Sequence, residues 1–173
     1  MKSEEVVLQI KSIYESLKDQ YSDSFDSSIR NHEYVLQKQW DQRTISKLNQ
    51  LKKSYLTYNI LIPTLNTLVG NEQLSQRRMI FVPQSHNDEQ IVDIMNKRWE
   101  MLRNEQDLQR KEYEAFIDAL IYNHGGHLEY NIQVDKYGDT EVVFEVGDPL
   151  NIMYEPNSQK YDLSDCSYII KLS

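Results

Sequence analysis

The sequence contains a single cysteine, Cys166, among its 173 residues. One cysteine excludes an internal disulfide and a cysteine-based zinc cluster. Its alternation with Tyr168 and Ile170 predicts a small core residue and not a nucleophile. No apolar run approaches the roughly 20 residues that a membrane span needs, and no secretion signal opens the chain. We therefore expect a soluble protein of cytoplasmic origin, without a membrane partner.

The sequence also lacks the signatures of common catalytic sites, such as a glycine-rich phosphate loop or a nucleophile elbow. His124 and His127 flank two glycines, but a structural zinc site needs about four ligands. Glu155, Asp162 and Asp165 could form an acid/base or magnesium pair, yet their loop is rich in residues that form turns. We therefore expect no enzyme, no cofactor and no metal.

The net charge of -8 is unevenly distributed. Residues 1–74 carry nine basic and nine acidic side chains, residues 75–123 seven and nine, and residues 124–173 three and nine. The acidic last third should repel phosphate and is a poor nucleic-acid surface. The exception is a basic stretch with no acidic residue between Asp41 and Glu72. The basic residues of this stretch are Arg43, Lys47, Lys52 and Lys53. They indicate a solvated helix face, and nucleic-acid binding is the rival interpretation.

Residues 1–123 read as a helical region. Apolar spacings of three and four predict helices over about 4–20, 29–40 and 44–59, with a Ser- and Asp-rich loop over 22–28. A further helix is expected from Pro63 to Gly70, followed by a short strand near 76–82 that Pro83 closes. The long helical stretch from Asn87 to Tyr122 has a polar gap, which favours a break near Asn104.

Residues 124–173 read as an antiparallel β region, because the apolar period changes to two after Gly126. The alternating runs predict a four-stranded meander, and helices followed by strands give an α+β fold. They are Leu128 to Val134, Val142 to Val146, Leu150 to Tyr154, and Cys166 to Leu172. Because only Ser173 follows the last run, we expect a truncated sheet from the front part of a longer protein.

Taken in order from about Gln39 to Leu172, five landmarks resemble the N-terminal part of the portal protein of tailed bacteriophages, in the branch typical of short-tailed phages. They are Gln39-Trp40-Asp41, the run from Asn59 to Glu72, the segment from Arg77 to Pro83, the stretch from Phe116 to Gly126, and the sheet with its loop from Glu155 to Asp165. The positions that match the family pattern are Asn66, Gly70, Asn71, Pro83, Asp118, Gly125, Glu155, Pro156, Asp162 and Asp165.

The resemblance implies a structural, wing-like piece of a homo-oligomeric ring, usually a dodecamer, at one vertex of the capsid. Double-stranded DNA would pass through the ring. The partners would be the terminase, the coat protein and the tail adaptor. The location would be the virion, and the host cytoplasm during assembly. The stem, clip and crown would lie outside this chain.

Four residues are candidates for contacts with a neighbour: Trp40, Arg43, Lys47 and Trp99. The main alternative to a portal subunit is a stand-alone helical adaptor whose helix from Asn87 to Tyr122 binds a partner through Trp99 and Leu102. A nucleic-acid-binding module built on the stretch from Arg43 to Lys53 is a third interpretation.

Overall fold

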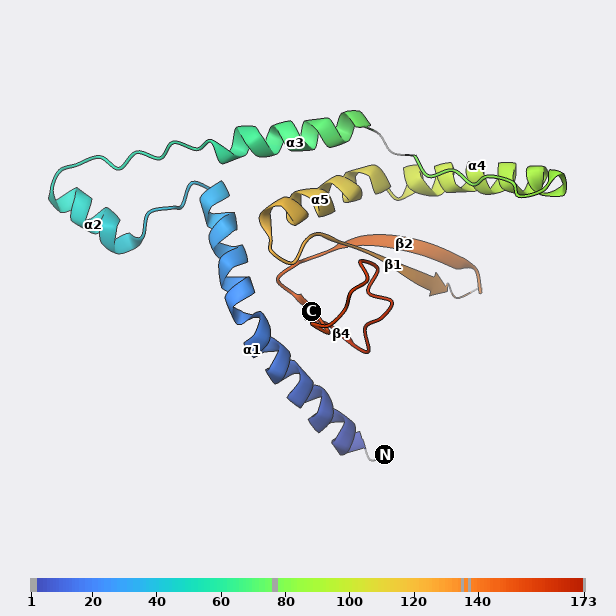
Figure 1. Ribbon diagram of the computed structural model, residues 1–173, viewed down its shortest axis with the longest axis horizontal. Coiled ribbons are helices and arrows are strands. Elements are labelled where there is room, and N and C mark those ends of the chain that lie inside the picture. The colour runs from blue at the N-terminus through green and yellow to red at the C-terminus, as the bar shows by residue number, and fades with distance from the viewer. Residues whose placement is uncertain (1–2, 76–77, 135, 137, 173) are drawn as a thin grey trace.

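The computed structural model describes residues 3–75, 78–134, 136 and 138–172. Helices come first and strands last, which confirms the α+β prediction (Figure 1). Within the described residues, no helix is both long enough and apolar enough to span a membrane.

The first helix, α1 (Ser3–Val35), is one continuous element. The prediction of two helices with a loop over 22–28 was therefore wrong. Tyr21 and Phe25 continue the apolar stripe that Leu17 begins, and Ser28 is fully buried where its Oγ accepts a hydrogen bond from the Asn123 N–H at 3.0 Å. These tertiary contacts outweigh the turn preference of the Ser- and Asp-rich segment.

Residues 36–60, which we call the arm, leave the end of α1 and return to the start of α3 (Figure 1). They contain α2 (Gln42–Gln50), which is shorter than the predicted helix over 44–59. The Asp41 side chain caps its start by accepting from the Thr44 N–H at 3.2 Å. Its end is a Schellman motif, in which Lys52 adopts a left-handed φ of 51° and the Lys53 N–H donates to the Leu48 carbonyl at 2.9 Å.

The next helix, α3 (Leu61–Ser75), begins two residues before Pro63 and continues past Gly70. Its predicted end at Gly70-Asn71 was therefore wrong. The predicted strand near 76–82 is also absent from Arg78 to Val82, and its first residues lie outside the described part of the chain. The backbone N–H and carbonyl of Phe81 bond to the side-chain amide of Asn96, at 2.8 and 3.1 Å, and not to a neighbouring strand.

A one-turn helix, η1 (His86–Asp88), leads into α4 (Glu89–Glu105), and α5 (Leu108–Ile121) follows after two residues. The predicted break near Asn104 is confirmed. Asp107 adopts a left-handed φ of 48° at the break. An ion pair between Arg103 and Glu112, at 2.8 Å, joins the two helices.

The strands form two separate two-stranded antiparallel sheets, so the four-stranded meander was wrong. β1 (His127–Val134) pairs with β2 (Thr140–Gly147), and β3 (Ile152–Tyr154) pairs with β4 (Ile169–Lys171). The chain turns between β2 and β3, where the Asp148 carboxylate accepts a hydrogen bond from the Leu150 N–H at 2.9 Å. Pro149 has no backbone N–H, so it cannot donate a hydrogen bond to a neighbouring strand. β3 therefore leaves the first sheet.

The main core lies between α1 and the second sheet. Leu17, Tyr21 and Met153 are buried there, and Tyr168 and Ile170 pack against them. The Tyr21 hydroxyl donates to the Tyr154 carbonyl at 2.9 Å, which ties β3 to α1. Cys166 is half-buried.

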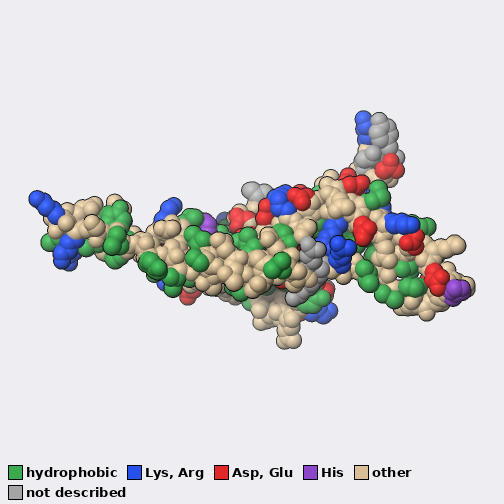
Figure 2. Space-filling model, turned by 90° about the horizontal axis from the view of Figure 1, so that it is seen from above, with side chains coloured by type: hydrophobic (Ala, Val, Ile, Leu, Met, Phe, Trp, Pro, Cys, Tyr) green, Lys and Arg blue, Asp and Glu red, His purple; other side chains and the backbone are tan. Residues whose placement is uncertain are grey.

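The molecule is elongated, as the space-filling view shows (Figure 2). Its accessible surface is 13666 Å². A compact monomer of this mass exposes about 8,900 Å² by the usual scaling with molecular mass. The chain therefore exposes roughly half as much surface again as a compact monomer would.

Candidate functional site

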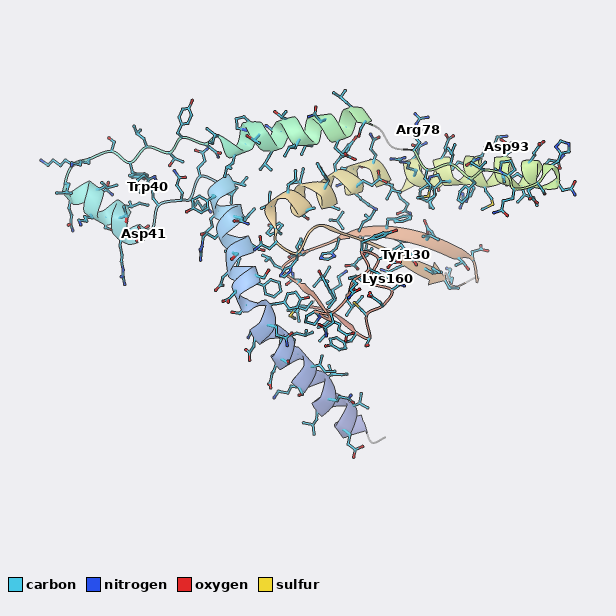
Figure 3. The ribbon with its side chains drawn as sticks, in the orientation of Figure 1. Trp40, Asp41, Arg78, Asp93, Tyr130 and Lys160 are labelled. Carbon is cyan, nitrogen blue, oxygen red and sulfur yellow. The ribbon has the colours of Figure 1, made fainter. Side chains whose placement is uncertain are left out.

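The four predicted contact residues lie at two ends of the molecule. Trp40 stands in the bend before α2, and Arg43 and Lys47 lie on α2 (Figure 3). Trp99 lies on α4, on the other side of α1 (Figure 1). The structure therefore brings three of the four together and leaves the fourth in a different environment.

The arm has few contacts with the rest of the described chain. None of the α2 residues is buried, and α2 has no substantial packing contact with another described helix or strand. Apolar side chains of the arm are exposed, with Tyr58 at 89% and Leu56 at 83% of their full accessible surface. Among the described residues, no ion-pair partner is found for Arg43, Lys47, Lys52 or Lys53.

The base of the arm is fixed by Asn59. Its Nδ2 donates to the Val35 carbonyl in the last turn of α1 at 3.0 Å. Its Oδ1 accepts from the N–H groups of Leu61 and Ile62 at 3.0 and 3.2 Å, which caps the start of α3. The arm thus projects from a hydrogen-bonded base.

Trp99 lines a cleft of about 490 Å³ formed by α4, α5, the end of α3 and the segment from Arg78 to Ile80. Its ring meets Phe144 of β2 edge-on, with centroids 6.3 Å apart. Its Nε1 is buried, without a hydrogen-bond partner among the described residues. The Trp99 ring therefore already packs against a residue of its own chain.

The charged side chains that line this cleft are glutamates and arginines. Arg103 and Glu112 bind each other at 2.8 Å, and Glu72, Glu100 and Arg78 complete the charged lining. The cleft therefore holds an ion pair and offers a charged contact surface.

The two predicted histidines flank the loop that enters β1. The ring of His124 lies 4.7 Å from that of Tyr21 and 4.9 Å from that of Phe25, and Gly125 adopts a φ of +77°. Burial lowers the pKa of both imidazoles, and the neighbouring His127 lowers that of His124 further. The described chain contains no group of three or more residues arranged to hold a metal ion.

The acidic loop after β3 is made of side chains that hydrogen-bond nearby backbone, as its composition predicts. Glu155 accepts from the Ser167 N–H at 2.9 Å, and Asp162 from the Ser164 N–H at 3.1 Å. Asp165 accepts from the Gln159 N–H at 2.8 Å and from the Ser158 hydroxyl at 2.7 Å. These bonds lower the pKa of Asp162 and Asp165 and keep both ionised. Pro156 is exposed in the same loop.

The other family-like positions lie on separate elements. Asn66, Gly70 and Asn71 are on α3, and Pro83 is exposed beyond it. Asp118 is half-buried on α5, where burial, Asp148 and Glu114 all raise its pKa. These positions share no single pocket, so they mark the fold rather than one chemical site.

Sequence reasoning missed one large exposed surface. Tyr130, Ile132 and Val134, which we call the hairpin face, alternate along β1 and are 69%, 64% and 64% exposed. Tyr130 is labelled in Figure 3. Alternation of apolar and polar residues along a strand normally indicates that the apolar face is buried. The sequence alone does not show that the apolar face of β1 stays exposed.

The chain matches none of the curated proteins with which it was compared. A family model described as phage P22-like portal protein matches residues 11–173, which is nearly the whole chain. Portal proteins are structural components of the bacteriophage virion. The landmarks from Gln39 to Leu172 that resembled a portal protein lie inside the matched range. This chain therefore belongs to the phage P22-like portal protein family.

Proposed function

We propose that this chain forms part of a portal subunit, in a ring through which phage DNA is packaged and later ejected. The observation that carries the proposal is the family match over residues 11–173. Closed cyclic rings use heterologous contacts, in which each copy presents two different surfaces to its two neighbours.

The exposed surface supports a subunit that is completed by assembly. The chain exposes 13666 Å², against about 8,900 Å² for a compact monomer of its mass. Many large apolar side chains on α4, the arm and β1 contribute to this surface. Large apolar surfaces of this kind are typical of protein interfaces.

The proposed subunit works by shape and not by turnover. In the described chain, Asp162 and Asp165 accept hydrogen bonds from backbone N–H groups of their own loop. Glu112 and Glu129 form ion pairs with basic side chains. The overall charge of -8 suits a protein near moving DNA, because like charges repel and lower the tendency to bind it.

The partners that fit this role are the terminase, which would dock on the ring and supply ATP hydrolysis, the coat protein around it, and the tail adaptor. The place of action would be the portal vertex of the virion, after assembly in the host cytoplasm. A dodecamer is the expected subunit number. The helical and β regions meet at 123–124, and we propose that both belong to the outer wing.

A genetic experiment tests the role. A phage genome with a nonsense codon early in this gene should produce heads without packaged DNA, and the intact gene supplied in trans should restore packaging. Normal DNA content in the mutant heads would contradict the proposal.

The alternative of a stand-alone helical adaptor rests on the exposed apolar residues Ile91 and Ile94 of α4. Its predicted contact residue Trp99, however, already packs on Phe144 of the same chain. An adaptor would stay monomeric at every concentration, whereas a portal subunit assembles with copies of itself.

A further inference from the structure

We propose that the arm of one copy docks on the hairpin face of the next copy around the ring. This inference rests on the proposed portal function and adds to it the two surfaces that meet. The occupant of each surface is a second copy of the same chain.

The arm has the composition of an interface element that lacks its partner. Exposed apolar side chains follow one another along its second half: Leu51, Tyr55, Leu56, Tyr58 and Ile60. Five basic side chains lie on the arm, and none has an ion-pair partner among the described residues: Lys38, Arg43, Lys47, Lys52 and Lys53. Aromatic residues are enriched at interface centres, and charged side chains are found mainly at the rim.

The hairpin face is equally incomplete. A two-stranded hairpin is only marginally stable in water unless its apolar face is covered. Helix α5 packs against β1 and β2, and Trp99 contacts Phe144, so the half of the hairpin next to α5 is covered. Tyr130, Ile132 and Val134 remain at least 64% exposed.

The charges of the two surfaces are opposite. Residues 36–60 contain five basic side chains and one acidic side chain, and residues 127–147 contain five acidic side chains and one basic. The net charges are therefore +4 and -4. Glu145 of β2 is paired with Glu129, so its side chain lies on the opposite side of the ladder from Tyr130, Ile132 and Val134, and its carboxylate borders the apolar face without lying on it. Complementary charge around an apolar centre fixes the orientation of a contact.

The positions of the two surfaces suit a ring. In Figure 1 the arm lies to the left of α1, and the strands β1 and β2 extend to the right of it. A copy therefore cannot easily satisfy its own hairpin with its own arm. A contact between two different surfaces repeats from copy to copy, and it closes into a ring when the rotation between copies allows.

Cysteine cross-linking tests the contact on the full protein encoded by the gene. In a Cys166→Ser background, Leu51→Cys places a thiol on the arm and Ile132→Cys places one on the hairpin face. With a short bis-maleimide, the double variant should give a ladder of covalent oligomers beyond the dimer. Each single variant alone should give none, and a mixture of the two single variants should give dimers.

Charge reversal provides a second test that needs no cross-linker. Arg43→Glu with Lys47→Glu should weaken assembly at least about tenfold, because the attraction between the basic arm and the acidic hairpin is then lost. Glu141→Lys with Glu145→Lys, placed in the same chain, should restore assembly. Lys18→Glu on α1 is the matched control and should leave assembly unchanged. Circular dichroism of each variant checks that the fold is retained.

The outcomes separate this inference from the proposed function. Rings that assemble without the arm-to-hairpin cross-link overturn the inference and leave the portal role intact. A ladder that stops at dimers also overturns it, because two copies would then pair reciprocally. If no assembly occurs, both fail. A third outcome is that no cross-link forms and the arm binds double-stranded DNA with an affinity that falls steeply as salt is added. The arm would then be a nucleic-acid-binding surface and not a contact between copies, which overturns the inference.

Discussion

Asn59 and Val35 join the two ends of the arm: the Asn59 side-chain amide donates to the Val35 carbonyl at 3.0 Å. The same side chain caps α3 through its oxygen. One residue thus fixes the end of α1 against the start of α3, and it sets where the arm leaves the body of the protein.

Replacing Asn59 should loosen this junction. Asn59→Ala removes both interactions and should lower the free energy of unfolding by about 1–2 kcal/mol, as loss of a helix cap does. Asn59→Asp keeps the capping oxygen and should cost less. Denaturant unfolding measures both. Asn66→Ala, at an exposed position on α3, is the control and should stay within about 0.5 kcal/mol of the parent.

The core between α1 and β3 should depend on Leu17, which is 1% exposed. Leu17→Ala leaves a cavity and should lower the free energy of unfolding by about 2–5 kcal/mol. Leu8→Ala makes the same chemical change on the same helix at a residue that is 67% exposed, and it should have little effect. Equal losses for the two variants would mean that α1 does not pack on β3.

The two glycines at 70 and 126 should respond in opposite directions to alanine. A Cβ at Gly126 would overlap the Ala115 carbonyl oxygen, so Gly126→Ala must displace α5 and should destabilise the fold strongly. Gly70 lies inside α3 with nothing within 4 Å of its added Cβ. Gly70→Ala should therefore raise stability by about 0.5–1 kcal/mol through helix propensity. Thermal melting of the two variants gives both signs.

Stability should fall in mild acid because of His124 and His127. Burial lowers the pKa of both rings in the folded chain below the value of about 6.5 expected when unfolded. The unfolded chain therefore binds more protons in this range, and stability rises with pH and is lost as pH falls below about 6.5. Melting temperatures at pH 7.5 and 5.5 measure the slope. The double variant His124→Gln/His127→Gln should reduce it, and an unchanged slope would assign the effect to other groups.

Local patterns predicted the break between α4 and α5 and the pairing of β1 with β2. The polar gap before Leu108 marked the break between α4 and α5, and the alternation around Ile132 and Val142 matches their observed pairing. Local patterns failed where distant residues decide the structure. Ser28 extends α1 because it binds the backbone of Asn123, and Asn96 takes the place of a strand beside Phe81.

The candidate site shows the same limit. The charge and aromatic content of the arm indicated Trp40, Arg43 and Lys47 as contacts, and all three lie on one projecting segment. Their roles in assembly stay predictions. The hairpin face could not be found from sequence, because its alternation is the same for a covered strand and for an uncovered one.

The most direct test of the central claim is the assembly state of the full protein encoded by the gene, measured by electron microscopy and native mass spectrometry of the same sample. The portal assignment predicts a closed ring of many identical copies around an open channel, with residues 3–172 at its outer part. A single copy at every concentration, with no ring in the images, would contradict it.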